Sequence, residues 1–303
     1  MHRQRYSKGH FCIREGLASA PELERFIREL RFLDVDDSTR IRTPSQRKRH
    51  RLYYFHFPSL DVPCVLKVDQ VDSGYSWLRR QELRLTGLLR DNARRSYEGA
   101  LALEQAGLET MRPLAHWTYR VSRFYREGYF LYQAIETDLG IKRYRDSIAD
   151  APSPKQLENF NQLIEMMARL TRRMHDAGLR HGDIVTGNFL VAGHERDKAG
   201  ELLITDATRV YLIDTDHIKK ARIALSPIKH FFDLYCLRRL DFDDEGVRFF
   251  LRRYYDRPDV NISRSLRFWE RGGFRLSFWL KGRRKKSYSN LDPREQKNEV
   301  EVP

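Results

Sequence analysis

The amino-acid sequence predicts an α+β protein whose first half is rich in strands and whose second half is mainly helical. Residues 52–57 and 62–68 are rich in β-branched and aromatic side chains, and the Pro-Ser-Leu-Asp between them is typical of a hairpin turn. Residues 156–176 carry apolar side chains close to the helical period of about 3.6 residues. We therefore expect an early antiparallel pair of strands and one long amphipathic helix near the middle of the chain.

The remaining predicted elements rest on the same kinds of pattern, with glycines suited to helix ends at Gly107 and Gly178. In chain order they are a helix at residues 93–106, a buried strand within residues 127–136, short strands at residues 189–191 and 210–213, and helices at residues 231–240 and 247–255. Polar or Pro-rich composition predicts irregular structure at residues 34–51 and 149–155.

Composition narrows the function classes. The 303 residues include 56 Lys and Arg against 42 Asp and Glu, a net charge of +14 that predicts an anionic partner such as a nucleotide, a nucleic acid, a phosphorylated glycan or an acidic membrane. Three widely spaced cysteines exclude a disulfide framework and a four-cysteine zinc site. No apolar run approaches the roughly 20 residues of a membrane span, so we expect a cytoplasmic or peripheral protein.

One group of residues points to phosphoryl transfer. Residues 181–188 read His-Gly-Asp-Ile-Val-Thr-Gly-Asn, Asp214 ends an apolar strand, and Lys67 lies within an apolar strand. Such chemistry needs a carboxylate beside the acceptor hydroxyl, oxygen ligands for Mg²⁺ and a cation for the non-reacting phosphates. We expect Asp183 to take the hydroxyl proton, Asn188 and Asp214 to bind Mg²⁺, and Lys67 to bind the phosphates.

Each of these residues also has a purely structural interpretation. Asp214 could cap a turn, and Lys67 could extend from an exposed strand face. The apolar neighbours of both residues favour the functional interpretation. His181 is expected to hold the loop backbone rather than to react. Asp216 is left open between assisting the metal or the acceptor and capping a turn.

The His-Gly-Asp-x4-Asn pattern resembles the catalytic loop of the protein-kinase-like superfamily, and its glycine resembles that of small-molecule and sugar kinases in the group. Residues 211–222, Tyr-Leu-Ile-Asp-Thr-Asp-His-Ile-Lys-Lys-Ala-Arg, are similar to a segment of the bacterial lipopolysaccharide core kinases, which phosphorylate Kdo or heptose. Residues 93–117 and 229–256 are similar to other parts of that family, so the resemblance covers about residues 40–256.

The resemblance implies a bilobal fold, with an N-terminal sheet lobe at residues 1–136 and a larger helical lobe at residues 137–280. Residues 281–303, basic and then acidic, are predicted to be a disordered tail. Residues 133–136 would connect the lobes and bind adenine through their backbone. The resemblance also implies ATP and Mg²⁺ as cofactors and a lipopolysaccharide core glycolipid as the acceptor.

The family pattern also implies a helix carboxylate that pairs with Lys67, and Glu98 is chosen for this role over Glu82 and Glu104. Two departures from the pattern are visible. Residues 34–51 contain no glycine, so the loop that covers the phosphates is not located, and a hydrophilic insertion within residues 192–209 stands where a tight hairpin is usual.

Two basic segments extend the analysis of charge. The cations of residues 42–51 would form either a phosphate-facing rim or a solvated loop. Residues 267–286 interleave aromatic and basic side chains, which is typical of contact with an anionic membrane but also of a core helix followed by a charged tail. We expect peripheral association with the cytoplasmic face of the inner membrane and no nucleic-acid partner. The rival functions are phosphorylation of a small molecule or a protein Ser/Thr, and a noncatalytic pseudokinase scaffold.

Overall fold

The computed structural model describes residues 2–6, 9–14, 40–41, 50–57, 62–69, 81, 91–122, 125–150, 152–220, 233–234 and 244–256. The chain divides into two compact units, Met1–Phe250 and Leu251–Pro303. The candidate site belongs to the first unit. The division of that unit into two lobes remains a prediction, and so does the disordered tail, since residues 281–303 lie outside the described residues.

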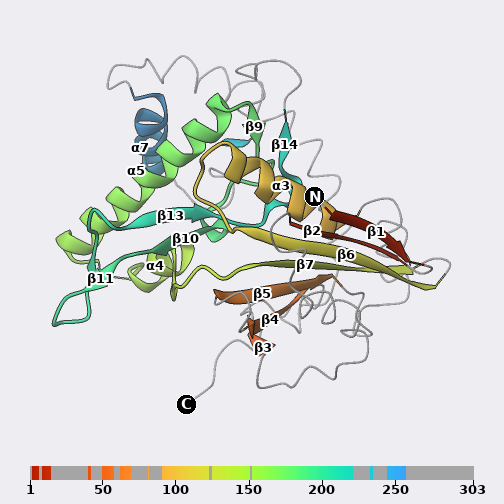
Figure 1. Ribbon diagram of the computed structural model, residues 1–303. Coiled ribbons are helices and arrows are strands. Elements are labelled where there is room, and N and C mark those ends of the chain that lie inside the picture. Colours follow the sequence, from red (N-terminus) through yellow and green to blue (C-terminus); the bar gives the residue numbers. More distant parts are fainter. Residues whose placement is uncertain are drawn as a thin grey trace. The chain divides into compact units, whose positions relative to one another are not determined.

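Strands from the first half of the chain form a seven-stranded antiparallel sheet (Figure 1). In spatial order its strands are β1 (His2–Tyr6), β2 (Gly9–Ile13), β6 (Pro113–Ser122), β7 (Tyr125–Gln133), β5 (Val62–Asp69), β4 (His50–Phe57) and β3 (Arg40–Ile41). The predicted hairpin is confirmed as β4 and β5, which pair with Phe57 opposite Val62. The predicted strand within residues 127–136 is β7, which ends at Gln133.

The alternation of side chains along β5 decides where Lys67 points. Cys64, Leu66 and Val68 belong to one buried cluster of the sheet, so Lys67 lies on the opposite face. Lys67 stands opposite Phe130 of β7, and Phe130 packs against Tyr97 of helix α3 (Asn92–Gln105). Lys67 therefore lies on the face of the sheet that α3 covers.

Helix α3 confirms the prediction at residues 93–106. The side chain of Asp91 caps its first turn by accepting from the Arg94 amide at 2.9 Å. The helix ends at Gln105, and Gly107 follows with φ +67°, a conformation that glycine adopts without strain. The long predicted helix is α5 (Pro154–Asp176), which begins in a capping box formed by Ser153 and Gln156. The irregular linker is thus shorter than expected.

Short strands before and after α5 form three small sheets. The sheet β13-β10-β8 contains β8 (Leu139–Gly140), β10 (Phe189–Ala192) and β13 (Arg209–Leu212), and β9 (Leu179–Arg180) pairs with β14 (Lys219–Lys220). The 3₁₀ turn η3 (Thr186–Asn188) ends the loop at residues 181–188, and a second one, η4 (Thr215–His217), follows β13. A short helix α4 (Ile141–Ser147) follows β8, and β11 (Glu195–Arg196) and β12 (Leu202–Leu203) form a hairpin.

Helix α7 (Asp244–Tyr255) confirms the predicted helix at residues 247–255. The predicted helix at residues 231–240 lies outside the described residues except for Asp233 and Leu234, which are helical. The mixed helix and sheet composition is confirmed. Among the residues that the structure describes, no helix combines the length and the apolar character needed to cross a membrane.

Candidate active site

An ion pair between Lys67 and Asp214 links the large sheet to the end of β13. The Nζ atom of Lys67 lies 2.7 Å from Oδ1 of Asp214, and the two side chains are 18% and 42% exposed. Burial opposes the charge on both groups, but the attraction between them prevails, so the pKa of Lys67 is raised and that of Asp214 is lowered. Asp214 has φ 60° and ψ 59°, a left-handed conformation that is strained for a residue with a side chain.

A second acid, Asp216, lies in the same turn. Its Oδ1 is 2.6 Å from Nδ1 of His217. Burial would raise the pKa of Asp216, but the hydrogen bond from His217 and the charge of Lys67 outweigh it and lower that pKa to about 2. The same hydrogen bond raises the pKa of His217. Asp216 is therefore anionic and already hydrogen-bonded to the neighbouring His217.

The turn before Asp183 is held by a buried carboxylate that sequence analysis did not identify. Asp233 accepts from the His181 amide at 2.7 Å, from the Gly182 amide at 2.6 Å and from Nε2 of His175 at 3.1 Å. Its side chain is completely buried. The sequence indicates such a residue by placing an acidic side chain inside the apolar run Phe-Phe-Asp-Leu-Tyr, because a buried carboxylate needs hydrogen-bond donors around it.

His181 and Asn188 connect the predicted catalytic loop to the strand that leads into Asp214. Nε2 of His181 lies 3.1 Å from the Ile213 carbonyl oxygen, which can only accept, so this nitrogen donates. The Ile213 amide donates to the Asn188 carbonyl at 2.9 Å, and Nδ2 of Asn188 donates to the Asp183 carbonyl at 2.9 Å. The backbone thus brings the predicted residues Asp183, Asn188 and Asp214 into one network.

Helix α3 packs closely on the turn that carries Asp214. The Thr215 hydroxyl donates to the Ser96 carbonyl at 2.7 Å, in a buried position. A Cβ atom at Gly99 would lie 2.2 Å from the Thr215 carbonyl oxygen and 3.0 Å from Cβ of Ile218. Only glycine allows this approach.

The structure does not pair Lys67 with Glu98. The Glu98 carboxylate accepts from Nε of Arg94 at 2.8 Å on the exposed side of α3. The rival Glu104 is bound to Arg14 at 2.8 Å, and Glu82 lies outside the described residues. The face of α3 toward the Asp214 turn presents Ser96 and Gly99, which carry no carboxylate. Among the described residues, Lys67 pairs with Asp214 instead.

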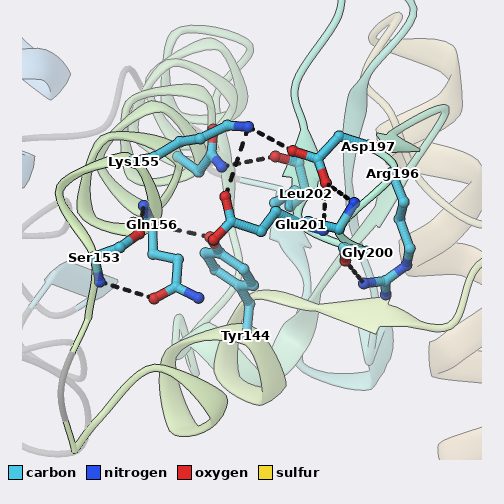
Figure 2. Close-up of polar contacts among 11 residues, drawn as sticks. Tyr144, Ser153, Lys155, Gln156, Arg196, Asp197, Gly200, Glu201 and Leu202 are labelled. Atoms are coloured by element: carbon cyan, nitrogen blue, oxygen red, sulfur yellow. Dashed lines mark hydrogen bonds and ion pairs between the residues drawn. The ribbon is translucent and has the colours of Figure 1, made fainter.

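The insertion within residues 192–209 is an ordered hairpin bound to the start of α5 (Figure 2). Figure 2 shows Lys155 reaching Asp197 and Glu201, at distances of 2.7 and 3.6 Å. Nδ2 of Asn159 donates to the Leu202 carbonyl at 2.8 Å, and Arg196 contacts Asp138 at 3.2 Å. The hairpin therefore binds both the start of α5 and the segment that follows β7.

Residues 133–136, predicted to bind adenine, border a cavity of about 390 Å³ that Ala192 and Tyr211 also line. The Gln133 amide donates to Arg112 and the Ala134 amide to Pro63. Among the described residues, no group pairs with the backbone of Ile135 or Glu136. Within that part of the chain, those backbone groups are available to bind a ligand.

The oxygen atoms of Asn188 and Asp214 suit Mg²⁺. Asn188 uses its Nδ2 within the loop, which leaves its amide oxygen as an acceptor, and Asp214 uses only Oδ1 for Lys67. Within the described ranges, no cluster of three or more His, Cys, Asp and Glu side chains could hold a metal. Kinase-type Mg²⁺ sites need only one or two carboxylates, because phosphates and water supply the remaining ligands.

The fold and this loop are those of a mixed helix-and-sheet protein with a kinase-type catalytic segment. The chain belongs to the lipopolysaccharide kinase (Kdo/WaaP) family, whose profile matches residues 70–239, more than half of its length. A solved structure described as WaaP in complex with acyl carrier protein is similar over 92% of this chain and 99% of that chain, with 17% identity and a TM-score of 0.54. No curated protein matches the chain. Membership supports a phosphotransferase of lipopolysaccharide biosynthesis and implies the use of ATP.

Proposed function

We propose that the protein transfers the γ-phosphoryl group of ATP, with Mg²⁺, to a sugar hydroxyl of the lipopolysaccharide inner core, on either Kdo or heptose. The observation that carries the proposal is the 2.7 Å contact between Lys67 and Asp214, because it joins the strand expected to bind phosphate to the residue expected to bind metal. Family membership supplies the class of acceptor.

Asp183 is proposed to orient the acceptor hydroxyl and accept its proton. Its loop is fixed at one end by Asp233, which binds the amides of His181 and Gly182, and at the other by Asn188. Holding the base in this way removes the entropy of positioning it during the reaction.

Lys67 is proposed to neutralise the non-reacting phosphates, with Asn188 and Asp214 as the residues that would hold Mg²⁺. The metal would stabilise the negative charge that develops on the phosphate oxygens. The raised pKa of Lys67 keeps its ammonium charged, which supports this role. The free backbone groups of Ile135 and Glu136 would bind adenine, between a small lobe built on the sheet and a larger lobe built around α5.

The excess positive charge supports a location at the cytoplasmic face of the inner membrane, where both the acceptor and the lipid surface are anionic. Neutralising the basic residues within 281–286 should weaken binding to anionic vesicles and leave ATP affinity unchanged. Vesicle sedimentation and nucleotide titration of the same variant measure the two effects.

A transfer assay tests the proposal. Purified protein is incubated with radiolabelled ATP, with and without Mg²⁺, in separate reactions that contain defined core lipid, small-molecule or protein acceptors. The products are analysed by mass spectrometry. We expect one added phosphate on a Kdo or heptose residue, only with Mg²⁺. Label appearing on protein or small-molecule acceptors but never on the core lipids would contradict the proposal.

A further inference from the structure

Strands β9 and β14 place like charges opposite each other beside the catalytic loop. In their antiparallel pairing, Arg180 stands opposite Lys219, and Lys220 stands opposite Leu179. Directly opposed like charges destabilise a strand pair. The Arg180–Lys219 pair therefore has an electrostatic cost that the fold alone does not explain.

No acid compensates this pair within the described part of the chain. Neighbouring cations do have partners there: Arg172 binds Asp176 at 2.8 Å and Arg173 binds Glu109 at 2.9 Å. By contrast, the described residues offer no hydrogen bond or ion pair to the side chain of Arg180 or Lys219. Asp216, the acid closest in sequence to Lys219, is bound to His217.

The pair adjoins the loop expected to receive the acceptor. Arg180 is followed directly by the His181-Gly182 turn that Asp233 holds, and Asp183 comes next. Cβ of His217, in the turn η4 that precedes β14, lies 3.6 Å from the place that a Cβ atom of Gly182 would occupy. Arg180 is thus three residues from Asp183 in the sequence, and its pairing brings Lys219 to the same end of the loop.

We propose that Arg180 and Lys219 bind an anionic group, carboxylate or phosphate, of the acceptor glycolipid. This inference rests on the proposed function. Two adjacent uncompensated cations suit such a group, since the planar guanidinium can form paired hydrogen bonds and the ammonium adds a point charge. Lys67 is already assigned to the nucleotide, so the pair serves the acceptor side of the reaction.

Three single variants test the proposal: Arg180→Gln, Lys219→Gln and, as the matched control, Lys220→Gln. Lys220→Gln removes the same charge from the residue next to Lys219, and the Lys220 side chain points to the other face of the strand. We expect the acceptor KM to rise about tenfold in each of the first two variants, equivalent to about 1.4 kcal/mol, while the ATP KM stays unchanged. Lys220→Gln should behave like the wild type. An unchanged acceptor KM in the first two variants, with an active wild type, overturns the inference and leaves the proposed function standing.

Acceptor binding without nucleotide supplies a readout independent of catalysis. Vesicles that contain core glycolipid should sediment the wild type more strongly than the Arg180→Gln/Lys219→Gln double variant, whereas vesicles of anionic phospholipid alone should bind both equally. An equal loss on both kinds of vesicle would make the pair a general membrane contact and overturn the inference. The melting temperature of the double variant should equal or exceed that of the wild type, because like-charge repulsion is relieved. A lower melting temperature would indicate a structural role instead.

Discussion

Gly99→Ala is a sharp test of the packing between α3 and the turn that carries Asp214. The new Cβ atom would meet the Thr215 carbonyl oxygen at 2.2 Å, so α3 and η4 must separate by more than about 1 Å to restore an ordinary contact. Helix propensity alone favours alanine over glycine by about 1 kcal/mol, whereas overpacking costs about 1–3 kcal/mol. We therefore expect a net loss of about 1 kcal/mol of stability, or a fall of about 2–4 °C in melting temperature.

The loss of activity should exceed the loss of stability. Displacing Thr215 also displaces Asp214, and a shift of about 1 Å in a reacting group can lower a rate by about a hundredfold. Thermal denaturation and the phosphate-transfer assay measure the two effects, with Glu98→Ala on the exposed side of α3 as the control. Gly99→Ala protein as stable and as active as the wild type would refute the close packing of α3 on this turn.

Three further predictions address other contacts. Asp233→Asn should destabilise the protein by about 3 kcal/mol or more in urea denaturation, because its amide group would face backbone donors in a buried position, while Asp176→Asn on the exposed surface should cost little. The pKa of His217 is raised, so the contribution of His217 to stability is complete below the ordinary pKa of 6.5 and declines as the pH rises through the raised pKa. His217→Gln should therefore remove this pH dependence from unfolding free energies measured between about pH 6 and about pH 9. Lys155→Ala should leave stability nearly unchanged, because the ion pairs of Lys155 are exposed to solvent. Asn159→Ala breaks a buried hydrogen bond to the Leu202 carbonyl and should cost about 1–3 kcal/mol, so equal losses in the two variants would contradict this account.

Local patterns were sufficient to predict the elements that carry the site. The strands at β4 and β5 and the helix α5 follow from periodicity and turn residues within their own segments, and the structure confirms them. The contact between Lys67 and Asp214 spans 147 residues of sequence, so only the folded chain could reveal it. The kinase-like sequence pattern predicted that these residues form one site, but it gave no distance between them.

The partner of Lys67 could not be chosen from the sequence, because the choice depends on which face of α3 meets the catalytic turn. Glu98 lies on the exposed side with Arg94, while the small residues Ser96 and Gly99 face η4. Asp233 was missed for a similar reason. Its three donors come from α5 and the catalytic turn, more than 50 residues away in sequence.

Comparing Asp183→Asn with the wild type tests the central claim most directly. Both proteins are assayed for phosphate transfer to core glycolipid and for the thermal shift produced by ATP and Mg²⁺. If Asp183 is the group that accepts the hydroxyl proton, the variant loses nearly all transfer and keeps its nucleotide-dependent shift. Wild-type turnover in the variant would contradict the assignment of Asp183.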